Sequence, residues 1–245
     1  KLLNYIPSDR ERGASQTPEL DIYTGLRDML FKLVSELQTL DPHGRDTAEF
    51  ERLLFITHLA ALKCVCDEKD LKGLAAKIAT SLLRYTMDIP VDKAFYDAGQ
   101  AQKDEHNFGV AFVFLNRFVD LTDAMSDPDS PDIDNSDFLE TDIPNPTRVP
   151  IPEAQYYSQE LKDEAREWVL EKAMSNDMNP QLPSRSCEKC SKQTYEAAIE
   201  CHSCHHQSTP CIVTGYPITK KEKVKCPNKS CGKEANKIDW NKYVG

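Results

Sequence analysis

Apolar residues recur at steps of three and four through the first half of the chain, which is the period of an amphipathic helix. The clearest stripe runs from residue 20 to residue 40, and Thr17 with Pro18 suits the start of such a helix. One face of this helix is therefore expected to pack against a partner helix. The stripe consists of Ile22, Leu26, Met29, Leu30, Leu33, Leu37 and Leu40.

After residue 40 the sequence predicts a break and then two more helices. The segment DPHGRD interrupts the stripe, and DTAE, beginning at Asp46, has the spacing of a capping box. The following FERLLFITHLAALKCV is apolar nearly all round, so this helix is expected at the centre of its domain. A third helix is predicted from Asp70 to Met87, and Pro90 ends the pattern.

Two more helices are predicted over residues 91–103 and 107–125. Large, small and apolar residues there stand near the corresponding positions of a tetratricopeptide repeat. These residues are Phe95, Gly99, Ala111, Leu115 and Phe118. The predicted fold class is mainly α, with residues 1–125 as a tetratricopeptide-like helical-repeat domain, the end of an α-solenoid, or a helical bundle. Such surfaces usually hold a partner.

The composition changes at residue 126. Residues 126–152 contain seven acidic side chains and six prolines, with no basic residue before Arg148. We interpret 126–157 as an acidic proline-rich linker, or as a strap pinned along the helices by Phe138, Leu139 and Ile143. Residues 158–183 are predicted to hold one more helix, ending near Met174, that packs on the helical domain.

That last helix is expected to bury one apolar stripe. Its members are Leu161, Ala165, Trp168 and Val169.

The charge of the 245-residue chain is uneven. Residues 187–245 carry ten lysines and six acidic residues, a net charge of +4. Because the whole chain carries −10, residues 1–186 carry −14. This difference indicates two domains. No apolar run approaches the length needed to cross a bilayer, so no membrane insertion is expected. Because the sequence begins at Lys1 without a signal segment, we interpret it as a fragment of a longer polypeptide.

Seven of the nine cysteines lie between residues 187 and 231. Four of them, Cys187, Cys190, Cys201 and Cys204, form two C-x2-C pairs separated by ten residues. Two such turns facing one another supply four thiolates in a tetrahedron, so we predict a structural zinc site, with unligated thiols as the alternative. The odd number and the clustering of the cysteines indicate a reducing compartment. A redox C-x2-C motif would stand at a helix start within a βαβ unit, which is not the pattern here. Residues 184–245 are thus predicted to form a small α+β module of zinc-ribbon type.

A second zinc site is possible on the remaining ligands. It would combine Cys211, Cys226 and Cys231 with His205 or His206, and a cross-brace that interleaves all the pairs is an open alternative. His202 is expected to point outward. No catalytic residue is predicted, because a closed four-sulfur site leaves no open metal position.

The apolar stretch after these cysteines is the predicted partner-binding surface. Its residues are Ile212, Val213, Tyr216 and Pro217, joined by Trp240 from a short polar helix. Core packing is the competing role for Tyr216 and Trp240. The lysines of KKEKVK either protect an edge strand or attract an acidic partner or nucleic acid. The acidic remainder of the chain argues against nucleic acid.

Several unusual strings carry a resemblance to a known family. CIVTGYPI and KEANKIDWNKYV, with AFVFLNRFVDL, SDFLETDIP and REWVL, resemble the C-terminal end of the intraflagellar transport protein 172 family. The resemblance implies a scaffold subunit of the transport trains, needed for cilium assembly and train turnover, with other A and B complex subunits as partners. It also implies a location in the cilium or flagellum and in the cytoplasm near the basal body.

The last segment also resembles a U-box, the metal-free relative of the RING domain. A U-box opens with Cys-Pro-Ile-Thr, and here Cys211, Ile212, Val213 and Thr214 occupy those places. The implied alternative function is a ubiquitin ligase that orients a ubiquitin-conjugating enzyme without a covalent step, or a ubiquitin-binding module. The sequence departs from the U-box by lacking the proline and by carrying Cys226 and Cys231.

Overall fold

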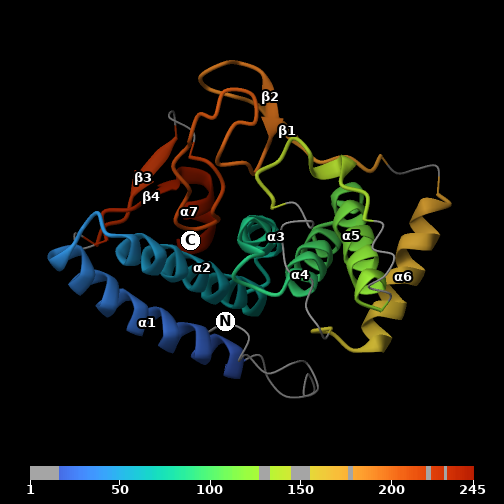
Figure 1. The fold of residues 1–245 in the computed structure, drawn as a ribbon, viewed down its shortest axis with the longest axis horizontal. Helices are drawn as coiled ribbons and strands as arrows, with labels where there is room; N and C mark the ends of the chain where they lie inside the picture. The colour runs from blue at the N-terminus through green and yellow to red at the C-terminus, as the bar shows by residue number, and fades with distance from the viewer. Residues whose placement is uncertain (1–16, 127–132, 145–154, 176–178, 219–221, 229–230) are drawn as a thin grey trace.

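The described chain is mainly helical, with two short strand pairs near its C-terminal end. A computed structural model describes residues 17–126, 133–144, 155–175, 179–218, 222–228 and 231–245. The helices stand in a row along the long axis of the molecule, and the cysteine-rich module lies across the middle of that row (Figure 1). The fold class expected from the sequence is confirmed at this level.

Five helices build the first part of the row, and each packs against the next one in sequence. This neighbour-to-neighbour order is compatible with a helical repeat, but the repeat type stays a prediction. The helices are α1 (Thr17–Leu40), α2 (Arg45–Glu68), α3 (Lys72–Leu82), α4 (Val91–Asp104) and α5 (Phe108–Ser126), with a 3-10 turn η2 (Leu83–Tyr85) after α3.

The start of α2 differs from the expected capping box. Its N-cap is Gly44, in an extended conformation and with no side-chain cap hydrogen bond, so Asp46 lies inside the first turn. The hydroxyl of Thr47 donates instead to the carbonyl of Asp41, 2.7 Å away. The capping-box prediction is therefore wrong, because the N-cap lies at Gly44, two residues before Asp46.

Close packing of α4 on α5 depends on a missing side chain. A Cβ atom at Gly99 would lie 2.6 Å from two side-chain carbons of Leu115. Phe95, Leu115 and Phe118 are each at most 1% exposed and belong to the larger core cluster. The small residue at position 99 thus allows the two helices to approach, as the sequence pattern indicated.

The segment 133–144 follows α5 as a partly anchored strap that includes the 3-10 turn η3 (Ser136–Phe138). Phe138 and Ile143 are buried in the larger core, whereas Leu139 is 72% exposed and anchors nothing. Arg117 on α5 is itself buried, and its guanidinium donates to the side chain of Asn135 at 2.7 Å while lying 4.6 Å from the centre of the Phe138 ring. Two of the three proposed anchors therefore hold this segment.

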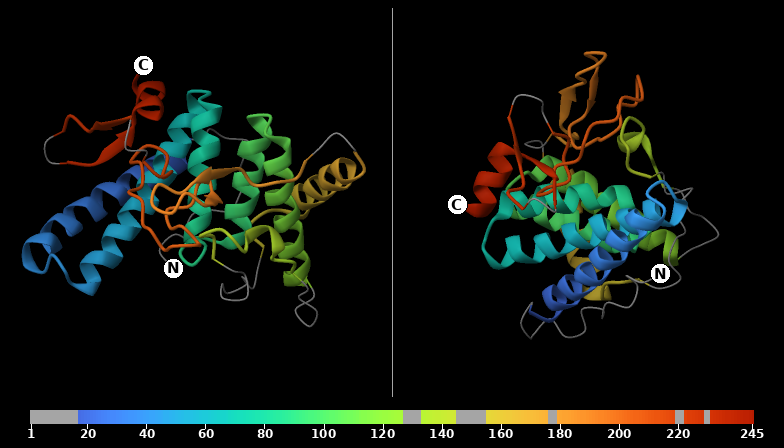
Figure 2. Two further views of the ribbon diagram at one scale, coloured as in Figure 1. Left: turned by 90° about the horizontal axis from the view of Figure 1, so that it is seen from above. Right: turned by 90° about the vertical axis from the view of Figure 1, so that its left-hand side faces the viewer.

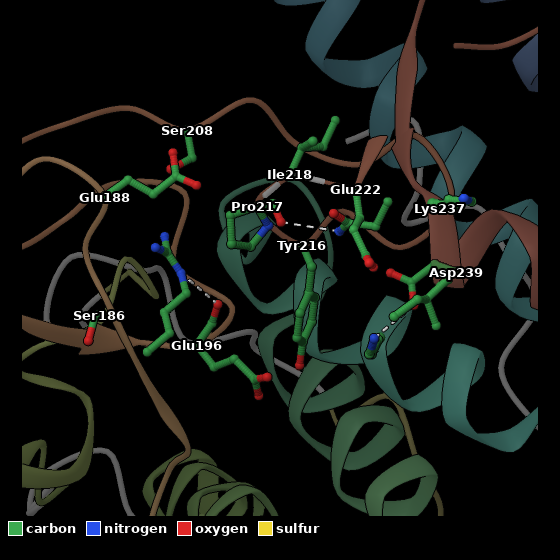
Figure 3. Close-up of a pocket in the computed structure, with 14 residues that line it drawn as sticks. Ser186, Glu188, Glu196, Ser208, Tyr216, Pro217, Ile218, Glu222, Lys237 and Asp239 are labelled. Carbon is green, nitrogen blue, oxygen red and sulfur yellow. Dashed lines mark hydrogen bonds and ion pairs between the residues drawn. The ribbon is translucent and has the colours of Figure 1, made fainter. Parts of the chain in front are cut away.

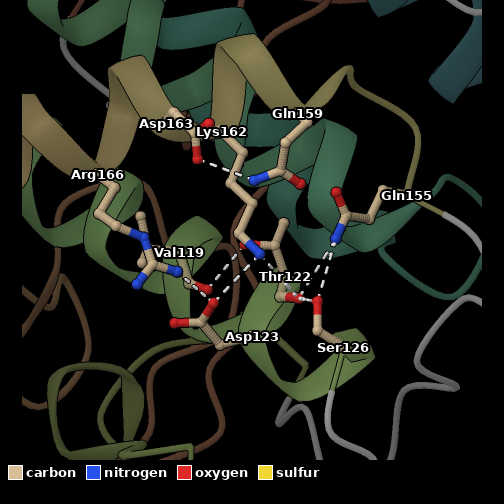
Figure 4. Close-up of polar contacts among 9 residues, drawn as sticks. All are labelled: Val119, Thr122, Asp123, Ser126, Gln155, Gln159, Lys162, Asp163 and Arg166. Carbon is tan, nitrogen blue, oxygen red and sulfur yellow. Dashed lines mark hydrogen bonds and ion pairs between the residues drawn. The ribbon is translucent and has the colours of Figure 1, made fainter.

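Helix α6 (Gln159–Ala173) packs on α5 through a polar contact that the apolar stripe did not predict. Lys162 is 5% exposed, and its ammonium lies 3.4 Å from the carbonyl of Thr122 and 3.2 Å from Asp123 (Figure 4). Arg166 also pairs with Asp123. A cation at the last turn of α5 is favourable because the carbonyl ends of a helix carry partial negative charge.

Two antiparallel strand pairs and one helix form the C-terminal module. β1 (Ser184–Ser186) pairs with β2 (Gln193–Tyr195), and β3 (Lys223–Lys225) pairs with β4 (Glu234–Asn236), followed by α7 (Lys237–Val244). The β3–β4 hairpin projects from the body of the molecule (Figure 2). Among the described helices, none is both long and apolar enough to cross a membrane.

Candidate metal centre and its module

Two backbone turns of the same shape carry the four predicted ligands. In the first, Ser191 has φ +60° and its N–H donates to the carbonyl of Cys187 at 2.9 Å. In the second, His205 has φ +53° and its N–H donates to the carbonyl of Cys201 at 2.8 Å. Each turn therefore aims both of its sulfurs toward the same side, as the C-x2-C spacing requires.

The four sulfurs meet at one point. Their ligand atoms all lie within 4.8 Å of one another, with 3.7 Å between the Sγ atoms of Cys187 and Cys204 and 3.8 Å between those of Cys190 and Cys201. A tetrahedron of Zn–S bonds of ~2.3 Å has sulfur–sulfur edges of about 3.8 Å. All nine cysteines are free of disulfides. The donor set and its spacing therefore fit a four-coordinate thiolate metal site.

The electrostatics of the cluster also favour a cation. Backbone N–H groups of Cys190 and Lys189 lower the pKa of Cys187 to about 6, so this sulfur is readily ionised. The hydrogen bond from the His206 N–H lowers the pKa of Cys204, but desolvation and the three neighbouring sulfurs together outweigh it and raise this pKa to about 12. Four adjacent thiolates repel one another, and a divalent cation at their centre removes that repulsion.

One strand pair flanks the first of the two C-x2-C turns. β1 precedes Cys187 and β2 follows Cys190, so the pair spans the first turn, and only β2 lies between the two turns. A single bridge between Glu200 and Gln207 spans the second turn. We call residues 184–210 the sulfur half of the module.

A third turn has the same backbone shape without a second cysteine. Gly215 has φ +74°, its N–H donates to the carbonyl of Cys211 at 2.8 Å, and Thr214 stands where the second sulfur would be. The Thr214 hydroxyl donates to buried Asp239 at 3.2 Å, and the other oxygen of Asp239 accepts from Lys77 on α3 at 2.8 Å. At the third turn, hydrogen bonds and one ion pair thus stand where the first two turns bring sulfurs together. We call residues 211–245 the polar half.

The ligands suggested for a second zinc do not converge. Within the parts of the chain that the structure describes, the first four cysteines form the one group close enough to share an ion. Cys211 is fully buried and its sulfur accepts from the N–H of Asn236 at 3.3 Å, while His205 is exposed and lies 2.7 Å from Glu200.

His202 does not point outward as expected. It is half-buried, and one ring nitrogen lies 3.0 Å from the hydroxyl of Ser203.

The predicted partner-binding stretch lies against the helices. Val213 and Tyr216 are 3% and 8% exposed, Pro217 is buried, and Ile212 and Trp240 are half-buried. The carbonyl of Ile212 lies 2.9 Å from a ring nitrogen of His58 on α2. Partner binding by these residues stays a prediction, and in this arrangement Ile212 and Trp240 offer the accessible surface.

Arg84, in the turn after α3, joins the two halves. Its guanidinium donates to the carbonyl of Ala197 in the sulfur half at 2.8 Å and to that of Gly215 in the polar half at 2.6 Å. Asp142 of the strap lies 3.9 Å from the same guanidinium and accepts from the N–H of Ile199 at 2.7 Å. Sequence reasoning missed both residues, since their partners are distant in sequence and no local pattern marks them.

A pocket of about 350 Å³ lies where the halves meet α3 (Figure 3). Arg185 and Glu196 line it from the sulfur half, Tyr216 and Ile218 from the polar half, and Lys77 from α3. Lys77 already lies 5.5 Å from the centre of the Tyr216 ring and pairs with Asp239. Lys77, one of the cationic residues that line the pocket, is thus engaged within the chain.

These features define a mainly helical protein with a small cysteine-rich module fastened across its helices, and with one candidate four-thiolate metal centre in that module. No protein-family model matches the chain. The chain belongs to the intraflagellar transport protein 172 family.

Three relatives show how far the similarity extends. The chain is 41% identical to intraflagellar transport protein 172 of Chlamydomonas reinhardtii over 227 residues, which are 89% of the chain and 13% of that protein. It is 37% identical to the Mus musculus homologue over 95% of the chain and 13% of that protein, and 32% identical to intraflagellar transport protein osm-1 of Caenorhabditis elegans over 69% and 10%. The chain thus spans 13% of the length of the first two, matching a C-terminal region.

Proposed function

We propose that this chain is a scaffold and protein-interaction region of an intraflagellar transport subunit, working in the cilium and near the basal body. In this role it contacts other subunits of the A and B complexes and supports cilium assembly and train turnover. The family relationship supports the transport role. The contacts with particular subunits are part of the proposal.

One observation carries the scaffold role. Arg84 connects both halves of the module to the helical row through two carbonyl groups, and its side chain is 7% exposed. Ala197 and Ala198 of the sulfur half and Tyr216 of the polar half share the larger core with α4 and α5. A module held in this way presents its surface at a fixed orientation, which lowers the entropic cost of binding a partner.

In this proposal zinc is structural. Cys187, Cys190, Cys201 and Cys204 would hold it, and a closed four-sulfur set supplies no open position for a substrate. The ion would stabilise the sulfur half, which otherwise has one three-residue strand pair and little core of its own.

A cell experiment tests the scaffold role. In cells lacking the endogenous subunit, full-length protein carrying Cys201→Ser is expected to give short or absent cilia and to recover fewer transport subunits on affinity purification. Cys226→Ser, outside the four-sulfur group, serves as the matched control and should restore cilia. Normal cilia and unchanged subunit recovery with a metal-free Cys201→Ser protein would reject the proposal.

A second candidate function is a U-box-like ubiquitin ligase or ubiquitin-binding module. The observation that favours it is the third turn, where the Thr214–Asp239–Lys77 contacts stand in place of a metal. Burial of Val213 weakens it, since that residue would have to touch the conjugating enzyme. Purified activating and conjugating enzymes should then give ubiquitin chains or self-modification that Ile212→Asp reduces. No product above a control lacking the chain would exclude ligase activity, and titration of labelled ubiquitin tests binding separately.

A further inference from the structure

We propose that the outer edge of β3 binds an acidic, extended peptide from another protein as an added strand. This surface lies outside the four-sulfur group and outside the stretch 212–217. It consists of the backbone of Lys223 and Lys225 with the lysine side chains around it. The inference is independent of the transport role, because it rests on the geometry and charge of the hairpin alone.

The backbone pattern shows which groups face outward. The N–H of Cys226 donates to the carbonyl of Lys233, and the N–H of Lys237 donates to the carbonyl of Glu222. Hydrogen-bonded positions alternate along an antiparallel strand, so Val224 also faces β4, whereas Lys223 and Lys225 direct their N–H and C=O groups away from it. With the other described residues, neither lysine forms a backbone hydrogen bond on that side.

The outer edge of β4, by contrast, already forms hydrogen bonds within the module. The carbonyl of Glu234 on β4 accepts from the N–H of Ile212 at 3.0 Å, and the N–H of Asn236 donates to the sulfur of Cys211 at 3.3 Å. Ala235 is fully buried in a small core. The hairpin is thus fixed on the inside and open on the outside, as the projecting pair in Figure 2 illustrates.

The positive charge of the hairpin favours an acidic binding partner. Among the described residues of the hairpin, from 222 to 237, four lysines outnumber two glutamates, in a chain whose net charge is −10. Lys223 pairs with Glu234 at 3.0 Å, but Lys225, Lys233 and Lys237 are exposed and form no ion pair with another described residue. Lysines on an edge oppose pairing with a neutral or basic strand, and they attract carboxylates.

An added acidic strand would match both the open backbone edge of β3 and the positive charge of the hairpin. Its backbone would pair with the outward groups of Lys223 and Lys225, while glutamates at alternate positions would lie on the face that carries those two side chains. Nucleic acid would use the lysines but leave the outward amide groups without a strand partner. The observations therefore favour a peptide over nucleic acid.

Fluorescence anisotropy tests the charge requirement on the metal-loaded 245-residue chain. The probe is a fluorescein-labelled octapeptide of alternating Thr and Glu, with a Thr and Lys octapeptide as the matched control. The acidic probe should bind, weaken as salt rises from about 0.05 to about 0.5 M, and lose about tenfold in affinity with Lys225→Glu. No binding of the acidic probe, or equal binding of both peptides, would overturn the proposal.

The strand requirement is tested separately. Proline at position 225 removes an outward N–H without touching the pairing with β4, so Lys225→Pro should weaken binding more than Lys225→Ala. N-methylation at alternate peptide residues should also abolish binding. Equal affinity for the methylated peptide, or equal competition by a single-stranded RNA of matched charge, would show simple polyanion attraction and overturn the proposal. Metal content and circular dichroism of each variant establish that the module is folded.

Discussion

The sulfur half and the polar half of the module use the same tight turn and stabilise it by different means. In the sulfur half two such turns bring four sulfurs within 4.8 Å of one another. In the polar half the equivalent turn places Thr214 against Asp239, which pairs with Lys77 of α3. In the role proposed above, the sulfur half would depend on an ion, whereas the polar half depends on its contact with the helical row.

This difference predicts different responses to the same perturbations. Loss of the ion should unfold the sulfur half first, because its own core is small. Loss of a contact with α3 should loosen the polar half while leaving the metal in place. Arg84 serves both halves, since it donates to a carbonyl in each. The predictions below separate these roles, from the largest expected effect to the smallest.

Metal removal should have the largest effect. Structural zinc in small modules contributes about 10 to 16 kcal/mol of apparent folding free energy, so a strong chelator is expected to unfold residues 184–210. Hydrogen exchange read by mass spectrometry should show loss of protection there and retained protection in α4 and α5. Unchanged protection of the sulfur half after complete chelation would show that the ion does not hold it.

Arg84→Ala should be the most destabilising substitution outside the sulfur cluster. It leaves the buried carbonyls of Ala197 and Gly215 unpaired and removes the cation beside Asp142, at an expected cost of about 3 to 5 kcal/mol in the free energy of unfolding. Arg52→Ala is the matched control, because Arg52 is exposed and its pair with Asp88 should contribute less than about 1 kcal/mol. Urea unfolding of both variants measures the difference, and equal midpoints would contradict the role of Arg84.

Gly215→Ala should cost about 3 kcal/mol through two effects. Its φ of +74° is unfavourable for alanine, and the new Cβ would lie 2.7 Å from the Cβ of Ser81. Gly232→Ala has φ +61° with open space around it, so it should cost only about 1 kcal/mol. The difference in urea midpoint isolates the contact with α3. If the two variants matched, the polar half would not be seated on Ser81 as described.

Thr214→Val should cost about 1 to 2 kcal/mol, because it leaves one oxygen of buried Asp239 without its hydroxyl donor. Thr214→Ser retains the donor and should stay closer to the unsubstituted chain. Elemental analysis should find the metal content unchanged in both variants. A metal-depleted Thr214→Val chain would mean that metal binding in the sulfur half depends on the Thr214 hydrogen bond in the polar half.

His58 gives the smallest expected effect, and it depends on pH. Burial lowers the pKa of His58 in the folded chain, although its hydrogen bond to the Ile212 carbonyl opposes the shift. The group therefore contributes stability above its unfolded pKa of ~6.5 and loses it as pH falls below that value. Thermal unfolding at a series of pH values should show a shallower decline between pH 7 and 5 for His58→Gln. Parallel curves would exclude His58 as a source of the acid sensitivity.

The sequence was sufficient for features that have a local period or spacing. The helix over residues 17–40 was predictable because the 3.6-residue period shows in the sequence itself. Its expected packing stripe is only partly correct, since four members are exposed: Ile22, Met29, Leu33 and Leu40. The group of four cysteines was predictable because each C-x2-C pair is a local turn with its own geometry.

Features fixed by distant partners were not predictable. Arg84 meets its two carbonyl partners across 113 and 131 residues, and buried Lys162 meets Thr122 across 40. A charged side chain usually indicates a solvated position, so nothing in the sequence marked either residue as buried. The capping box at Asp46 failed for a related reason, since the conformation of Gly44 decided where the helix begins.

Metal stoichiometry tests the central claim most directly, namely that one half of the module is held by an ion and the other by hydrogen bonds. Elemental analysis of the purified chain should give one zinc per molecule, one in Cys226→Ser, and none in Cys201→Ser. Two zinc ions per molecule falling to one in Cys226→Ser would place a second ion in the polar half and contradict the claim. A zinc-free chain with a folded sulfur half would contradict the part of the claim that an ion holds the sulfur half.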